Sequence, residues 1–267
     1  METVALFCGC KYDKKVQVEE NISLRFTDIG HLLGSAAIEL WLREGDTTKK
    51  IVFSGDVGNT DQPIIKDPTP VAEADYLVLE STYGNRLHAP AADTVEMLAA
   101  LIDETIDRGG NVVIPSFAVG RTQELLYAIR EIKARGLTRH PKFPVYVDSP
   151  LAIEATEIFS KCDPSCFDEE TQALIRAGID PIRFEELRLS VTADDSKRIN
   201  TDPHPKVIIS ASGMCEAGRV RHHLKHNLWQ EKNLILFVGY QAVGTLGRAL
   251  TEGAKRVKLF GEEIAVQ

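Results

Sequence analysis

From residue 76 onward, short continuous apolar runs alternate with amphipathic helical patterns. The apolar runs lie at 76–80, 112–115, 144–148, 207–210 and 234–238. Between the first runs, the spacing of apolar residues predicts one helix over 93–107 and another over 121–134. Continuous apolar strands separated by helices are typical of a parallel sheet that helices cover on both faces. The sequence therefore predicts an α/β fold, with ligands bound at the carboxyl ends of the strands.

The part of the chain before residue 75 follows a different pattern. Short strands are predicted at 16–18, 21–26, 37–42 and 51–53. Two Gly- and Ser-rich loops, 28–36 and 54–59, directly follow strands. Such loops present side chains and backbone amides at the end of a sheet. Residues 161–206 are less periodic and contain four prolines, so we interpret them as helices and loops around the sheet.

The composition excludes several classes of protein. A hydrophobic fraction of 43% is ordinary for a globular protein. The formal net charge of −8 argues against a protein that holds nucleic acid by bulk positive charge. Any anion site must be local. No apolar run approaches the roughly 20 residues of a membrane span, so no membrane association is predicted.

The five cysteines form an odd set in a long chain, which argues against a disulfide framework. The simplest interpretation is reduced cysteines in a cytoplasmic protein. A four-thiolate zinc site made by Cys8, Cys10, Cys162 and Cys166 is an alternative that their spacing leaves open.

Three residues with metal-binding chemistry follow three predicted strands. His31 lies in the first Gly-rich loop, Asp56 lies in the second, and Glu80 closes the apolar run that begins at residue 76. Imidazole and carboxylate groups are ligands for zinc or manganese. The alternative is that each side chain only stabilises a turn. The ordered set with its flanking glycines favours a metal site.

Three strand–turn–helix units point to an anion site. Ser116 and Arg121 follow one strand, Ser149 and Pro150 follow another, and a Ser212-Gly213-Met214 turn follows a third. A helix carrying Arg219 is predicted from about residue 215. Helix N-termini with unpaired amides bind anions, and Ser and Arg side chains complete such sites. For Ser149 we favour a capping role alone.

The predicted helix over 215–228 carries three histidines. His222 and His226 lie four residues apart on its polar face, and His223 lies beside its apolar stripe. The pair could bind a metal, but the neighbouring Arg and Lys residues favour a basic, RNA-facing or solvated surface. Phe117 and Tyr83 could stack on a nucleobase or belong to the core.

Seven segments together resemble the β-CASP family of metallo-β-lactamase-fold nucleases, and the resemblance covers nearly the whole chain in order. They are DIGHLLGSA (28–36), FSGDVGN (53–59), LESTYGN (79–85), PSFAVGRTQE (115–124), YVDSPLA (146–152), ISASGMCEAGR (209–219) and FVGYQAVGTLGR (237–248). These nucleases process RNA and are similar to the cleavage-and-polyadenylation endonuclease. The match is closest to bacterial and archaeal members.

The resemblance implies an architecture and roles. Residues 1–84 and 248–267 would be parts of an αββα metallo-β-lactamase-like sandwich, and 85–247 would be an inserted β-CASP domain. His31 would bind one metal, Asp56 would bridge two zinc ions in catalysis, and Glu80 would position or polarise a catalytic histidine or a metal ligand. The substrate RNA would be held by the β-CASP residues Ser116, Arg121, Ser212, Gly213, Met214 and Arg219.

The sequence also departs from the family pattern. It contains no His-x-His, the family's last histidine ligand would lie beyond Gln267, and Ala249 stands where some members carry a catalytic histidine. A two-metal site needs more ligands than His31 and Asp56 supply. We therefore expect the chain alone to be inactive, as the middle part of such an enzyme or a natural truncated relative.

The activity implied is zinc-dependent hydrolysis of RNA phosphodiesters, with endo- or exonuclease action left open. One alternative is a non-catalytic module that binds RNA or phosphate. A weaker one is a hydrolase of small esters, which would not need so large an insert. Core exposed by missing parts would favour self-association into a homo-oligomer.

Overall fold

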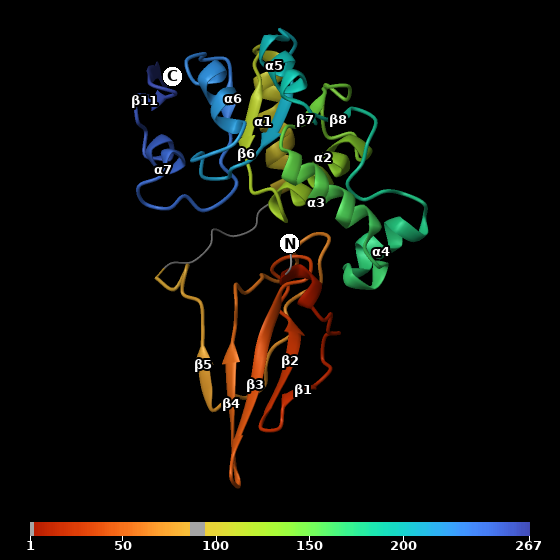
Figure 1. The fold of residues 1–267 in the computed structure, drawn as a ribbon. Helices are drawn as coiled ribbons and strands as arrows, with labels where there is room; N and C mark the ends of the chain where they lie inside the picture. Colours follow the sequence, from red (N-terminus) through yellow and green to blue (C-terminus); the bar gives the residue numbers. More distant parts are fainter. Residues whose placement is uncertain (1–2, 86–93) are drawn as a thin grey trace. The chain divides into compact units, whose positions relative to one another are not determined.

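A computed structural model describes residues 3–85 and 94–267, and these form two compact units. The first unit contains the described residues up to 85 together with Pro164–Gln172, and the second contains the described residues from 94 to 163 together with Ala173–Gln267. The predicted fold class is confirmed: the chain is α/β, with a parallel sheet flanked by helices (Figure 1).

The first unit is built on a five-stranded sheet whose strands lie in chain order, β1-β2-β3-β4-β5 (Figure 1). The strands are β1 (Val16–Glu19), β2 (Ile22–Asp28), β3 (Ala36–Glu44), β4 (Thr47–Phe53) and β5 (Tyr76–Val78). Neighbours are antiparallel as far as β4, and β5 runs parallel to β4. Two 3₁₀ turns, Thr3–Leu6 and Pro164–Cys166, also belong to this unit.

One face of this sheet buries a carboxylate. Glu39 is fully buried and accepts hydrogen bonds from Arg25 Nε at 2.7 Å and Thr27 Oγ1 at 2.5 Å, while Lys50 Nζ lies 2.5 Å from it. Burial alone would raise the pKa of Glu39, but these partners outweigh burial and hold the pKa at about 2. The charge is therefore stabilised inside the sheet face.

The opposite face of the sheet is apolar and only partly covered. Phe26, Ile38 and Phe53 lie in one cross-strand row. Ile38 is 38% exposed and Phe53 is 41% exposed, and every residue of β5 is exposed. An apolar sheet face of this kind favours contact with further polypeptide.

The second unit contains the predicted parallel sheet, in the order β10-β6-β9-β7-β8. Its strands are β6 (Val112–Pro115), β7 (Val145–Val147), β8 (Leu187–Leu189), β9 (Val207–Ser210) and β10 (Leu234–Ile235). All neighbouring pairs are parallel. Every residue of β6 and β9 is buried, which explains their continuous apolar sequences.

The α-helices are α1 (Thr94–Asp107), α2 (Arg121–Ala134), α3 (Pro150–Lys161), α4 (Glu169–Arg176), α5 (Ala193–Thr201), α6 (Val220–Asn227) and α7 (Leu246–Thr251). Helices α1 and α6 contact β6, and α1 also contacts α2. The hairpin of β11 (Arg256–Leu259) and β12 (Glu262–Ala265) packs against α6, where Leu259 joins the apolar cluster of Leu224. Residues 248–267 thus lie in the second unit. The assignment of these residues to a lactamase-like domain stays a prediction. The assignment of 85–247 to the inserted domain also stays a prediction.

Three predictions about elements were wrong. The apolar run at 76–80 was expected in the parallel sheet, but its strand β5 is exposed and pairs with β4 in the first unit. The helix expected from residue 215 begins at Val220, because Cys215 and Gly218 have left-handed backbones with φ of 64° and 78° that a helix cannot contain. The region 161–206 was expected to lack strands, but Leu187–Leu189 pairs with β7 as β8. A three-residue edge strand carries too short a pattern to be recognised.

Candidate functional site

The three predicted metal-site residues lie together in the first unit. His31 follows β2, Asp56 follows β4, and Glu80 follows β5. His31 Nε2 lies 3.8 Å from Asp56 Oδ2. Glu80 Oε1 accepts a hydrogen bond from the amide of Val57 at 2.5 Å, and Glu80 Oε2 accepts one from Thr82 Oγ1 at 2.9 Å. Glu80 therefore fixes the loop that carries Asp56.

A glycine allows the two Gly-rich loops to approach this closely. The amide of Gly58 donates to the carbonyl of Ile29 at 2.9 Å. A Cβ atom at Gly58 would lie 1.7 Å from the carbonyl oxygen of Gly30 and 2.7 Å from the amide nitrogen of His31. Only glycine fits there, so Gly58 brings the Asp56 loop against the His31 loop.

The donors in this place do not complete a zinc site. Within residues 3–85 and 94–267, no group of three or more His, Cys, Asp or Glu side chains is arranged to hold a metal ion. His31 and Asp56 supply two donors, and a tetrahedral zinc needs about four. Their metal roles and the role of Glu80 stay predictions. In the same described part of the chain, the proposed four-thiolate cluster is not formed either.

The second unit presents loops from neighbouring parallel strands at one edge of its sheet. The loop after β6 carries Ser116, and the loop after β9 carries Ser212, Gly213 and Met214. The amide of Ser116 donates to the carbonyl of Ser210 at 3.0 Å, which joins the starts of these two loops. The edge predicted to bind phosphate thus has two adjacent loops.

The residues predicted to bind substrate differ in their exposure. Ser116 is only 1% exposed, and its hydroxyl donates to the carbonyl of Phe117 at 3.2 Å. The Arg121 side chain is exposed and pairs with Glu124 at 2.5 Å. The Ser212 hydroxyl is buried and has no hydrogen-bond partner among the described residues. Of these, Arg121 has the side chain most accessible to a substrate phosphate.

Gly213 and Met214 contribute backbone to the same loop. A Cβ atom at Gly213 would lie 3.0 Å from the ring of Phe117, so the ring rests directly on this glycine. The carbonyl of Met214 accepts from the amide of Gly247 at 3.1 Å, and the carbonyl of Gly213 accepts from Gln241 Nε2 at 3.0 Å. The loop after β9 is therefore anchored to the segment that leads into α7.

Behind these loops lies a buried charge network that the sequence did not reveal. Asp148 and His223 are both fully buried, and His223 Nε2 lies 2.7 Å from Asp148 Oδ2. Ser196 Oγ donates to Asp148 at 2.6 Å, and Arg219 NH1 donates to it at 2.7 Å. Arg219, predicted to bind substrate, thus uses its guanidinium inside the unit, and a substrate contact by it stays a prediction. The one feature of the sequence that could have indicated this network is the position of His223 beside the apolar stripe of α6.

The network lowers the pKa of its carboxylate. Burial alone would raise the pKa of Asp148, but hydrogen bonds from His223, Ser196 and Arg219 hold it at about 2. An unfolded Asp titrates near about 3.9. The folded state is therefore stabilised above about pH 4, and this contribution is lost as pH falls toward 2.

We expect the melting temperature to fall steeply between about pH 4 and pH 2, because Asp148 and Glu39 both have a pKa of about 2 in the folded chain. Circular dichroism melts across this range measure the effect. Asp148→Asn removes one titrating group, so its melting temperature should depend less on pH in this window. An equal pH dependence in the variant and the unmodified chain would contradict the assignment.

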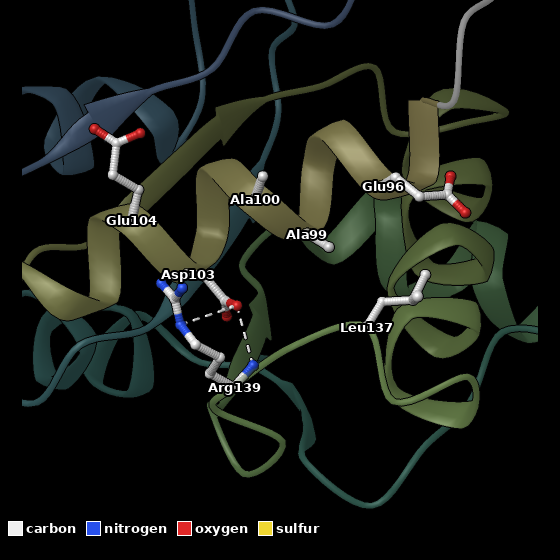
Figure 2. Close-up of a pocket in the computed structure, with 7 residues that line it drawn as sticks. All are labelled: Glu96, Ala99, Ala100, Asp103, Glu104, Leu137 and Arg139. Atoms are coloured by element: carbon white, nitrogen blue, oxygen red, sulfur yellow. Dashed lines mark hydrogen bonds and ion pairs between the residues drawn. The ribbon is translucent and has the colours of Figure 1, made fainter.

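At the other candidate sites, key side chains already have partners within the chain. Figure 2 shows a pocket on α1 lined by Glu96, Ala99, Ala100, Asp103, Glu104, Leu137 and Arg139. Its buried carboxylate is already used: Asp103 accepts from the amide of Arg139 at 3.0 Å and pairs with the Arg139 guanidinium at 3.6 Å. His222 and His226 are exposed on α6, as expected, and His222 stacks on Phe260 at 4.3 Å between ring centroids. We assign no function to these places.

Comparisons with known proteins bear on the family of the chain. The Beta-Casp domain family matches residues 122–250. A Thermus thermophilus protein named Ribonuclease TTHA0252 is 37% identical over 246 residues, which cover 92% of this chain and 55% of the relative. An RNase J-like protein of Methanocaldococcus jannaschii is 38% identical over 259 residues, covering 96% of this chain and 58% of that protein.

A relative with lower identity has a different name. Transcription termination factor FttA of Methanosarcina mazei is 33% identical over 256 residues, covering 94% of this chain and 39% of that factor. The chain thus spans little more than half of the two ribonuclease-named relatives and less of the factor. In the described parts of the chain, no helix is long and apolar enough to cross a membrane. The matched Beta-Casp domain and the similarity to these relatives show that the chain belongs to the β-CASP family.

Proposed function

We propose that this chain is the RNA-holding part of a phosphodiester hydrolase and carries part of its metal site. The observation that carries the proposal is the meeting of His31 and Asp56 at 3.8 Å, on loops that follow two strands of one sheet. Relatives named as ribonucleases support RNA as the substrate. The anchored loops after β6 and β9 offer a surface for the RNA backbone.

The roles of individual residues follow from their contacts. Glu80 holds the turn after β4 through the amide of Val57, so it keeps Asp56 facing His31. We propose zinc as the metal of the intact enzyme, with His31 and Asp56 as two of its donors. These two donors alone do not complete a zinc site among the described residues.

RNA binding in this proposal is local. The net charge of −8 gives little long-range attraction for a polyanion, so a few contacts at the sheet edge must hold the strand. The candidates are Arg121, with its exposed guanidinium, and the backbone of the Ser212-Gly213-Met214 turn. Ser116 would support the loop without touching the RNA, because its hydroxyl is buried and donates to the carbonyl of Phe117.

The second candidate is a non-catalytic RNA-binding module, which the incomplete donor set favours for the chain taken alone. We expect the purified chain to bind labelled single-stranded RNA and to leave it uncut with or without added zinc. Elemental analysis should find fewer than two tightly bound zinc ions per chain. Zinc-dependent cleavage, or two tight zinc ions, would contradict inactivity; absence of RNA binding would contradict the proposal itself.

Location and self-association are further parts of the proposal. Cys8, Cys10, Cys166 and Cys215 carry free thiols, which is consistent with a reducing cytoplasm. The half-exposed Phe53 and the exposed strand β5 support association of two copies through the first unit.

A further inference from the structure

One aromatic ring stands exposed at the carboxyl edge of the second unit's sheet. Phe117 lies in the loop after β6, and it is 48% exposed although it follows a fully buried strand. A Phe side chain left half in water loses much of the free energy that burial would give it. Because the ring is only half buried, packing in the core does not explain its position.

Buried hydroxyl groups fix the backbone of Phe117. Thr122 is 1% exposed, and its hydroxyl donates to the carbonyl of Phe117 at 2.7 Å and lies 3.2 Å from Ser116 Oγ. The Ser116 hydroxyl donates to the same carbonyl. Two buried hydroxyls thus fix the backbone of Phe117, which explains why the residue before it is a buried serine.

A glycine supports one part of the ring. The nearest atoms to a Cβ at Gly213 would be Phe117 Cδ2 at 3.0 Å and Cε2 at 3.1 Å. Any side chain at position 213 would therefore push the ring away. The glycine in the loop after β9 and the fixed backbone after β6 together hold the ring while leaving about half of its residue exposed.

The chemistry around the ring suits a nucleic acid. The cationic Arg121 lies four residues farther along the chain, at the start of α2, and its side chain is exposed. Single-stranded nucleic acids bind where aromatic rings accept bases beside groups that contact the backbone. Because the chain carries a net charge of −8, stacking supplies attraction that does not depend on bulk charge.

We propose that Phe117 is a stacking platform for a nucleobase of single-stranded RNA, with Ser116, Thr122 and Gly213 as residues that position its ring. The inference rests on the proposed function, because it names how the same sheet edge holds RNA. It assigns base contact to Phe117 and leaves phosphate contact to Arg121.

The test is RNA affinity of the full chain, measured by fluorescence anisotropy with a labelled single-stranded oligouridine. Phe117→Ala should weaken binding by about 5- to 100-fold, the range that base stacking on an aromatic ring supplies. Phe117→Trp should bind within about two-fold of the unmodified chain, because its larger ring also stacks. The salt dependence should keep its slope in Phe117→Ala, since no phosphate contact is lost.

Trp229 offers a matched control. It is 56% exposed, and it lies between α6 and β10, near the amino end of a strand whose carboxyl end faces the proposed site. Trp229→Ala should leave RNA affinity within about two-fold. Equal losses in both variants would overturn the assignment to this edge. A second probe lacking its bases should bind the unmodified chain and Phe117→Ala equally.

The outcomes separate the two proposals. If the unmodified chain binds the oligouridine and Phe117→Ala binds it equally well, the stacking role is wrong while the proposed function stands. If the unmodified chain does not bind, the proposed function fails together with the stacking role. Circular dichroism should show the same melting temperature, within a few degrees, for the chain and Phe117→Ala, because the ring is only half buried.

Discussion

Replacing Asp148 by alanine is expected to lower the free energy of unfolding of the second unit by about 3–5 kcal/mol. Asp148 is fully buried and neutralises the Arg219 guanidinium at 2.7 Å. It also contacts His223 Nε2 at 2.7 Å. Removing the carboxylate leaves these groups inside the unit without their acceptor, which costs more than the pair itself contributes.

Urea denaturation followed by circular dichroism at the helix band measures this loss, because nearly all helical residues lie in the second unit. Asp194→Ala is the matched control: Asp194 is an exposed carboxylate that pairs only at the surface with Lys197. Its replacement should change stability by less than about 1 kcal/mol. Similar effects of the two substitutions would show that the buried network does not stabilise the unit as described.

The second large effect is expected for Gly58→Ala in the first unit. The added methyl would overlap the backbone of Gly30 and His31, which no side-chain rotation can relieve. The two Gly-rich loops must separate, and His31 and Asp56 with them. We expect a loss of about 1–3 kcal/mol in stability, typical of overpacking, and a zinc affinity at least about tenfold weaker, as when supports of metal ligands are lost.

Trp41 reports on the first unit, since it lies in β3, so its fluorescence in a Trp229→Phe background follows that unit alone. Zinc affinity is measured by competition with a coloured chelator. Gly9→Ala is the control, because a Cβ at Gly9 would meet no heavy atom within 4 Å. If Gly58→Ala has the same stability to unfolding and the same zinc affinity as Gly9→Ala, then neither property requires the close approach of the two loops.

The parts of the fold that depend on local sequence could be predicted. The all-apolar runs of β6 and β9 required burial on both faces, and this fixed the parallel sheet. The positions of His31, Asp56 and Glu80 followed from a general rule, that loops after strands carry the functional side chains of a sheet. Only their separation, such as 3.8 Å between His31 and Asp56, needed the structure.

The parts that depend on distant partners could not be predicted. His223 looked like one of three helix-face histidines, and only the fold brings it to Asp148, which lies 75 residues earlier in the chain. Glu39 lay in an alternating strand with no sign of burial, because its partners come from both neighbouring strands. Phe117 was left open between core and surface, since an apolar residue after a buried strand fits both.

We expect single-stranded RNA to lie along the carboxyl edge of the second unit's sheet. Photo-crosslinking of the chain to an RNA containing 4-thiouridine, followed by mass spectrometry of the peptides, tests it most directly. We predict crosslinks in the loops after β6 and β9, at or beside Phe117 and Met214. Crosslinks confined to the amino edge, around Trp229, or to the open sheet face around Phe53 would contradict this placement of the RNA.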